Sequence, residues 1–552
     1  MRYYHLIGIL LLLFQTMYCE KTKKNVVPFQ LQQQVTKNSQ ISASRTVANT
    51  APEVTAVYET ETFSYQTIQV ITIDASVVDG NDSPITGALV EIRDTGNINT
   101  IYQQVSNSNG RVQGSLNLNT TETTIYVYVT YKGVTTPAKA VAIRTGNNQV
   151  LVRITQIKID VSSSTLSAMT SSSSDSSSVN YSTDTDGDGV VDAYDDYPND
   201  PNKSTKLKFP ASGGVNTIGF EGLFPAAGDA DLNDTVVVYY IEEDLNASGQ
   251  IVEIRGNYQY MAHGAGTKHS LYLRLPSTVN ITYSSEIRDG NGVLQANGSM
   301  NKSTTEATGI NAFTPSTTDL QDGLRILGNT DTTLGSSNWN TRTTDTTYVN
   351  GYIAKTKIVF NTPVARSVLG LAPYDTFIRL ESRPVDANYP AAAPRSITTA
   401  SSFQVYEVHR PGFYKYTSQV TVDGDLREIG EDIYIDKNNF PFSVIVPGLW
   451  KWPEESEDLR VSSTSGYPKF ATWTASQGQQ DRDWYNDPSA ATNTKNYYAW
   501  VITNRAALDA PNSFLTAHIG KVSLDEYQTI LFVLVLVIIG TLYLRYKFSP
   551  IK

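Results

Sequence analysis

The strongest constraint on the fold is a two-residue hydrophobic period that recurs along most of the chain. Residues 67–74 (TIQVITID), 124–130 (TIYVYVT) and 150–154 (VLVRI) alternate β-branched or aromatic residues with polar ones. Such alternation is typical of half-buried strands, and short strands separated by turn residues indicate a sandwich or barrel. Residues 206–504 carry further runs of this kind between Gly, Asn, Asp and Pro. The sequence therefore predicts an all-β protein.

The length of 552 residues is too great for one hydrophobic core, and we expect about three domains. A polar segment at 20–51 is predicted to precede a small β-sandwich at 52–155 and a Ser-rich linker at 156–183. An Asp-rich loop at 184–201 then leads into a large β domain of sandwich type at 205–504, and a stalk follows at 505–526. The large β domain is either one domain or two tightly joined ones.

Two apolar segments mark the ends of the chain. Residues 1–19 carry the run LIGILLLLF after Arg2, which predicts a secretory signal. Residues 527–546 contain ILFVLVLVIIGTLYL, about long enough to span a bilayer, and a basic tail follows at 547–552. We expect an exported protein with one C-terminal transmembrane helix and its ectodomain outside the cytoplasm, in the periplasm or at the cell surface. A processed sorting signal would have the same pattern, and lipidation of Cys19 is an alternative to signal cleavage there.

The charge and cysteine content narrow the class of partner. The formal net charge is -11 and the isoelectric point is about 5.1, which excludes nucleic acid as an expected partner because that affinity depends on cationic side chains. The only cysteine, Cys19, lies within the predicted signal, so no disulfide is expected to stabilise the exported part. A bound cation is the expected substitute.

An acidic loop, DTDGDGVVDAYD at residues 184–195, has oxygen ligands at the spacing that wraps one Ca²⁺. Its seventh position binds through a carbonyl, and Gly189 at the sixth allows the sharp turn. Seven aspartates between residues 184 and 200, with no basic residue among them, would repel one another without a cation, which favours a metal site over an acidic linker. The predicted ligands are Asp184, Asp186, Asp188, Val190, Asp192 and Asp195.

This loop departs from an EF-hand, because Asp195 stands where a bidentate Glu is usual and no amphipathic helix flanks it. With its continuation DYPNDP it resembles the thrombospondin type 3 calcium repeats of secreted and bacterial surface proteins.

A second resemblance lies in VDGNDSPITGALVEI at 78–92 and SNGRV at 108–112, which are similar to the carboxypeptidase-regulatory or transthyretin-like β-sandwich family. That family implies a spacer or binding module.

A third resemblance covers the large domain. The segment IGFEGLFPAAGDADLNDTVV at 218–237 is similar to the signature F-E-D-x-W-P-x-x-G-D-x-D-x-N-D-x-V-V of LruC domain proteins. Further similarity lies in EVHRPG at 407–412, PGLWKWPE at 447–454 and YPKFATW at 467–473. Gly222 and Phe224 replace the usual acidic residue and Trp of the signature. The resemblance implies a bacterial exported or cell-envelope protein.

The same signature predicts a second acidic site. If the chain runs extended into a strand at 235–240, Asp229, Asp231 and Asn233 project from one face. With Glu221 and Asp234 nearby, these oxygens form a candidate second Ca²⁺ site. The alternative is a turn in which the Asx side chains cap their own backbone.

Three function classes follow. The preferred one is a non-catalytic binding or adhesion ectodomain that takes a glycan or an envelope protein, with Trp450, Trp452, Trp473 and Trp484 as candidate exposed anchors. The others are a structural scaffold and a hydrolase that acts on polysaccharide. We expect no enzyme, because adjacent carboxylates on one strand more often share a cation than act as acid and base, and the histidines lack a zinc-binding spacing.

Overall fold

The structure is a computed structural model that describes residues 46–47, 50–60, 63, 65–144, 150–161, 183–290, 293–295, 311–334, 339–342, 349–384, 397–399, 403–422, 424–461 and 465–486. The predicted signal, stalk, transmembrane helix and tail lie outside these residues, as do most of the polar N-terminal segment and most of the Ser-rich linker. Within the described part of the chain, no helix is long and apolar enough to cross a membrane.

The N-terminal part consists of strands that form two sheets. These strands are β1 (Thr46–Val47), β2 (Glu53–Thr60), β3 (Ile68–Val78), β4 (Leu89–Arg93), β5 (Thr100–Val105), β6 (Arg111–Asn119), β7 (Thr124–Tyr131), β8 (Val134–Thr135), β9 (Lys139–Ala142) and β10 (Val150–Lys158). One sheet has the order β2-β10-β3-β6, and the other has the order β1-β8-β7-β4-β5 with β9 on β7. The alternation predicted from the sequence is visible in β3, where Ile71, Ile73, Ala75 and Val77 are buried and the residues between them are half-buried.

The larger part continues with three more sheets. Its strands are β11 (Thr205–Phe209), β12 (Asn216–Phe220), β13 (Thr235–Leu245), β14 (Ile251–Ala262), β15 (Lys268–Arg274), β16 (Ile281–Arg288), β17 (Asn311–Phe313), β18 (Leu324–Leu327), β19 (Ile353–Val364), β20 (Asp375–Pro384), β21 (Ile397–Thr399), β22 (Phe403–Val408), β23 (Val420–Val422), β24 (Asp425–Arg427) and β25 (Ser443–Pro447). Short helices interrupt them: α4 (Thr317–Asp322), α5 (Thr330–Thr333), α6 (Arg366–Leu369), α7 (Phe470–Ala475) and the 3-10 turn η2 (Trp484–Asn486).

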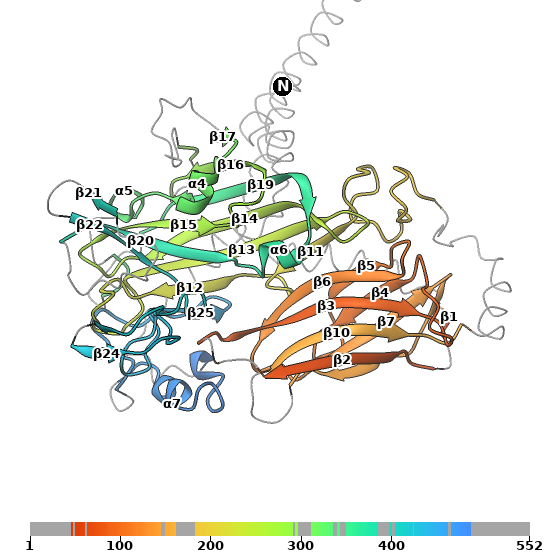
Figure 1. The fold of residues 1–552 in the computed structure, drawn as a ribbon, viewed down its shortest axis with the longest axis horizontal. Helices are drawn as coiled ribbons and strands as arrows, with labels where there is room; N and C mark the ends of the chain where they lie inside the picture. The colour runs from red at the N-terminus through yellow and green to blue at the C-terminus, as the bar shows by residue number, and fades with distance from the viewer. Residues whose placement is uncertain are drawn as a thin grey trace, which may run out of the picture.

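An eight-stranded sheet dominates this part, with the order β17-β16-β19-β14-β13-β12-β25 and β11 paired to β13. Its central strands β13 and β14 are buried along their whole length. One face of β13 shares a core with the second sheet, β18-β15-β20-β22-β21, and the other face packs against the C-terminal segment that contains Trp450 and Trp473 (Figure 1). The predicted all-β sandwich class is therefore confirmed.

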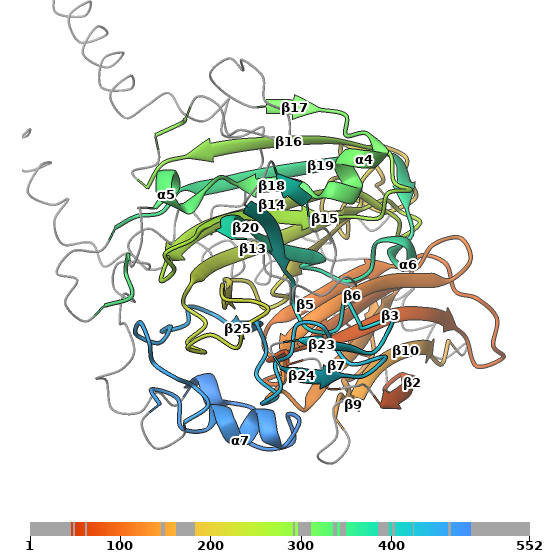
Figure 2. The same cartoon turned by 60° about the vertical axis from the view of Figure 1, so that its left-hand side comes forward.

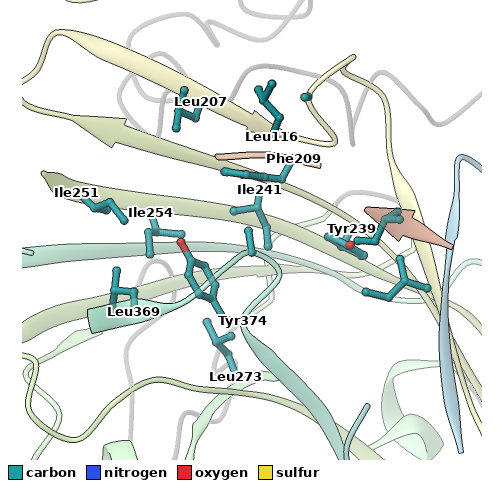
Figure 3. Packing of buried hydrophobic residues seen from close by; sticks show 14 of the residues in the cluster. Leu116, Leu207, Phe209, Tyr239, Ile241, Ile251, Ile254, Leu273, Leu369 and Tyr374 are labelled. Carbon is teal, nitrogen blue, oxygen red and sulfur yellow. The ribbon is translucent and has the colours of Figure 1, made fainter. Parts of the chain in front are cut away.

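The two parts share one continuous core. Figure 3 shows Leu116 of β6 beside Leu207 and Phe209 of β11, and the helix α6 lies next to this contact in both overall views (Figures 1 and 2). A Cβ at Gly114 would lie 3.2 Å from the Leu207 side chain, so the small residue lets the two strands approach. The Asn117 Nδ2 of the sandwich donates 2.8 Å to the Ala372 carbonyl oxygen of the larger part.

A second core cluster corrects one expectation from the sequence. The four tryptophans proposed as exposed anchors are instead buried, with 5%, 2%, 1% and 0% of Trp450, Trp452, Trp473 and Trp484 exposed. Trp473 packs edge-on against Phe63, with ring centroids 5.2 Å apart, and thereby joins α7 to the segment that precedes β3. These rings stabilise the fold and are not available to a ligand.

The burial of Trp473 leads to a stability prediction. Trp473→Ala should lower the free energy of unfolding by about 3–5 kcal/mol, because it leaves a cavity among aromatic rings. Urea denaturation followed by circular dichroism measures this change. Trp339→Ala, at a tryptophan that is 38% exposed, is the control and should cost much less. Equal effects of the two substitutions would contradict the assignment of Trp473 to the core.

Candidate metal centres

The Asp-rich loop folds back on its own carboxylates. Asp184, Asp186 and Asp188 are half-buried, whereas the residues between them are exposed. Asp184 accepts hydrogen bonds from the backbone N–H groups of Gly187, at 2.8 Å, and Gly189, at 3.0 Å. Both glycines have positive φ, 77° and 97°, which their missing Cβ allows. The loop thus turns its three carboxylates inward, and one oxygen of each lies within 4.8 Å of the others.

Three carboxylate oxygens of this loop have no hydrogen-bond donor within the described part of the chain: Oδ2 of Asp186, Oδ2 of Asp188 and Oδ2 of Asp195. The other oxygen of each accepts a backbone N–H, from Asp188, Val190 and Tyr197 respectively. Burial, with the charges of Asp188 and Asp186, raises the pKa of Asp195 to about 7. Carboxylate oxygens of this kind are the ligands that Ca²⁺ takes in proteins.

Asp192 has a different environment from the other predicted ligands. Its two oxygens accept hydrogen bonds from the Thr185 backbone N–H at 2.8 Å and from the Thr185 hydroxyl at 2.6 Å.

The side chain of Val190 is buried in a small cluster with Leu89 and Val105 of the N-terminal sandwich. The loop therefore contacts the sandwich on one side.

The other side of the loop is attached to the hairpin of β13 and β14. The Tyr197 hydroxyl donates to Asp244, and the Lys203 Nζ contacts both Asp244, at 2.9 Å, and Glu253, at 2.8 Å. Arg255 pairs with the same two carboxylates. The predicted calcium loop consequently lies at a junction between the sandwich and the central strands of the large sheet.

The second acidic cluster lies where several separate segments meet. Glu221 directly follows β12, and Asp234 directly precedes β13. The prediction of an extended backbone at residues 228–233 was wrong, since Gly228, Ala230 and Leu232 have positive φ of 61°, 61° and 56°. The alternating conformation still places acidic side chains together: one oxygen each of Glu221, Asp229 and Asp231 lies within 4.8 Å of the others.

Backbone groups from distant parts of the chain hold this cluster in place. Asp231 accepts hydrogen bonds from the backbone N–H groups of Asn233, at 3.0 Å, and Ser456, at 2.9 Å. Asn233 Nδ2 donates to Asp231, at 2.7 Å, and to the Pro453 carbonyl oxygen, at 3.2 Å. These bonds orient the Asn233 amide so that its oxygen faces away from Asp231.

In the part of the chain that the structure describes, carboxylates outnumber cations in the cluster, and several of its oxygens receive no donor. Within the described residues, no hydrogen-bond donor reaches Oε1 or Oε2 of Glu221 or Oδ1 of Asn233, and both side chains are fully buried. Burial, followed by the charges of Asp234, Asp231 and Asp229, holds the pKa of Glu221 well above its usual range. Burial and the charges of Asp234 and Asp229 also hold the pKa of Asp231 well above its usual range. The pKa of Asp234 is also raised, chiefly by burial.

Glycines create the space around these oxygens. A Cβ at Gly228 would overlap Glu221 Oε1, and one at Gly264 would overlap Asn233 Oδ1 and lie 2.6 Å from Glu455 Oε2. A side chain at either position would fill the region where the unpaired oxygens converge. Ca²⁺ takes six to eight oxygen ligands, and the carboxylate and amide oxygens present fit that chemistry.

Glu455 is a cluster member that the sequence analysis missed. Burial, with the charges of Asp234 and Asp229, raises its pKa to about 7. It lies 221 positions after Asp234, just beyond the PGLWKWPE segment, and no spacing rule connects the two residues.

His263 and His269 are buried beside the cluster, with ring centroids 5.4 Å apart, and His269 Nδ1 lies 2.5 Å from the Thr235 hydroxyl.

Part of the large domain is similar to one family of proteins. Residues 249–485, less than half of the chain, match a family described as Domain of unknown function (DUF4842). No curated protein matches. Among solved structures, 3-chlorocatechol 1,2-dioxygenase from Rhodococcus opacus 1CP is 6% identical with a TM-score of 0.14, covering 28% of this chain and 97% of its own. BcpA, the major pilin subunit of Bacillus cereus, is 8% identical with a TM-score of 0.13, covering 67% and 97%. Likenesses this weak carry no functional argument.

The raised pKa values predict how stability depends on pH. In the metal-free protein, Asp195 and Glu455 titrate near 7, whereas unfolded carboxyl groups titrate near about 4. The native state then binds more protons than the unfolded state, so this contribution to stability is fully present below about pH 4 and is lost as the pH rises through about 7. Ca²⁺ needs the ionised carboxylates, so the increase in melting temperature that it causes should be larger at pH 7.5 than at pH 5. Differential scanning fluorimetry of calcium-free and calcium-loaded protein measures both trends, and a pH-independent calcium shift would contradict them.

The buried Glu221 leads to a prediction in which one substitution acts differently on the calcium-free and the calcium-bound protein. Glu221→Gln replaces a buried carboxyl that is costly to ionise with a neutral group of the same shape, so the melting temperature of the calcium-free protein at pH 7.5 should stay the same or rise, and the stabilisation by Ca²⁺ should fall. Calorimetric titration should show one bound Ca²⁺ fewer. Glu91→Gln is the matched control, because the buried Glu91 pairs with Arg93 at 2.6 Å. It should destabilise the protein and leave calcium binding unchanged. A fall in the calcium-free melting temperature for Glu221→Gln would contradict the proposed electrostatics.

Proposed function

We propose that this chain is a calcium-stabilised, non-catalytic ectodomain of a bacterial cell envelope, exported by the segment 1–19 and anchored by the segment 527–546. The observation that carries the proposal is the set of buried carboxylate oxygens without donors in both acidic clusters. Native structures pair such atoms, and a divalent cation is a partner that fits a group of oxygens in which carboxylates outnumber the nearby bases.

The family assignment belongs to the same proposal. The match of residues 249–485 to a domain of unknown function supports a LruC-like domain over residues 205–504. The two-sheet arrangement of β1 to β10 supports a carboxypeptidase-regulatory or transthyretin-like sandwich before it. Both families imply export and a role in binding, with a glycan or an envelope protein as the ligand class.

The mechanism that we propose for calcium is mechanical stabilisation of a junction. The first Ca²⁺ would be held by Asp184, Asp186, Asp188, Asp195 and the carbonyl of Val190. By neutralising these carboxylates it would hold the loop in the conformation that buries the Val190 side chain against Leu89 and Val105. The loop also contacts Asp244 through Tyr197, and Lys203, two residues after the loop, contacts Asp244 and Glu253, so ordering the loop would stabilise the sandwich against the large sheet.

The second Ca²⁺ would stabilise the large sheet itself. It would be held by Glu221, Asp229, Asp231, Asn233 and Asp234, with Glu455 contributing to the same negative cluster. Because Glu221 directly follows β12 and Asp234 directly precedes β13, a cation there would offset repulsion beside the ends of two paired strands. Binding to the native state alone adds stability by mass action.

Calcium removal tests the proposal directly. At a free Ca²⁺ concentration a hundredfold above the dissociation constant, each site should add about 2.7 kcal/mol to the free energy of unfolding. Asp186→Ala plus Asp188→Ala should remove the contribution of the loop and leave that of the second cluster. The control is Glu53→Ala plus Glu59→Ala, which removes the same charge from exposed positions of β2. An unchanged melting temperature with Ca²⁺ and with chelator would overturn the proposal.

A further inference from the structure

A cavity of about 780 Å³ lies where the N-terminal sandwich meets the large part. The sandwich contributes Ile68 and Val70 of β3, and the large part contributes Leu275, Leu369 and Phe413, so most of these walls are apolar. The volume falls within the range of small-molecule sites. No residue that lines it belongs to either acidic cluster.

Arg410 lines this cavity and is a buried cation without an anion. Its side chain is only 6% exposed. Its Nη2 donates to the Tyr374 carbonyl oxygen, and its guanidinium lies 4.9 Å from the centre of the Phe413 ring. Within the described residues, no acceptor reaches its Nε and no carboxylate lies at ion-pair distance. A buried charge without a partner is costly unless something else compensates it.

The neighbouring carboxylates already have other partners. Asp375 accepts from the Tyr414 hydroxyl at 2.8 Å, and its other oxygen lies 2.7 Å from His409 Nδ1. Glu407 pairs with Arg274 at 2.8 Å and with Arg379 at 2.7 Å. Of these charged groups, Arg274, Asp375 and Arg410 line the cavity, so its wall carries two guanidinium groups and one carboxylate, an excess of one positive charge.

We propose that the cavity binds a small amphipathic carboxylate, whose charged group pairs with Arg410 and whose apolar body lies against Ile68, Leu275 and Leu369. Guanidinium groups bind carboxylates with paired, charge-assisted hydrogen bonds, and the apolar walls favour a hydrocarbon body over a sugar or an inorganic anion. Because both parts of the protein line the cavity, the ligand also stabilises their contact. The inference goes beyond the binding role proposed above, because it assigns a separate small-molecule site rather than a glycan or envelope-protein surface.

The probe pair for the test is 4-phenylbutyrate and 4-phenylbutan-1-ol, which share the apolar body and differ in charge. Titration calorimetry on the purified full-length protein, saturated with Ca²⁺, should show binding of the carboxylate at least tenfold tighter than that of the alcohol. Arg410→Gln should weaken carboxylate binding at least tenfold and leave alcohol binding within twofold. Absence of carboxylate binding, or equal affinities for the two probes, would overturn the proposal.

Two further variants separate binding from folding. Leu371→Trp keeps Arg410 but fills the cavity from a partly exposed lining position, and it should weaken binding of both probes. Arg153→Gln removes the same charge from an exposed pair with Glu59 and should change neither affinity. Undiminished carboxylate binding by Leu371→Trp would place the site elsewhere and overturn the assignment. Calcium dependence of the melting temperature is measured separately, so failure of the calcium proposal and failure of this one are distinguishable.

Discussion

Repulsion among buried carboxylates is the constraint on which much of the large sheet depends. Glu221, Asp231 and Asp234 are buried within one cluster, and the strands β12 and β13 begin or end at its members. Backbone N–H groups satisfy several of these oxygens, yet both oxygens of Glu221 receive no donor from the described residues. Either protons or a cation must compensate this charge.

The Asp-rich loop connects the same electrostatic requirement to the arrangement of the two β parts. Its inner side gathers half-buried carboxylates, and its outer contacts reach both the sandwich, through Val190, and the β13–β14 hairpin, through Lys203. The two parts also meet directly, at Leu116 and Leu207, so the loop reinforces an apolar interface that exists without it (Figure 3). The acidic loop and the hydrophobic packing therefore meet at one junction.

Local patterns predicted some elements well and others not at all. The period-two runs at 67–74 and 150–154 lie almost entirely within the strands β3 and β10, because alternation reports burial on one face of a strand. The loop spacing correctly anticipated that Asp184, Asp186 and Asp188 lie together. The extended backbone expected at Asp229 was wrong, since no local pattern announces positive φ at Ala230 and Leu232. The prediction that the four tryptophans are exposed rests on residue type, which cannot distinguish a core ring from a surface one.

By itself, the sequence determined the all-β class and the two acidic segments, because strand alternation and ligand spacing are properties of a few consecutive residues. Only the tertiary structure decided which oxygens remain unpaired, that Glu455 joins a cluster 221 positions away, and that Arg410 is buried at a cavity without an anion. Burial and charge compensation depend on all the segments that surround a side chain. Those segments come from both β parts of the chain, and their proximity is set by packing rather than by any local pattern.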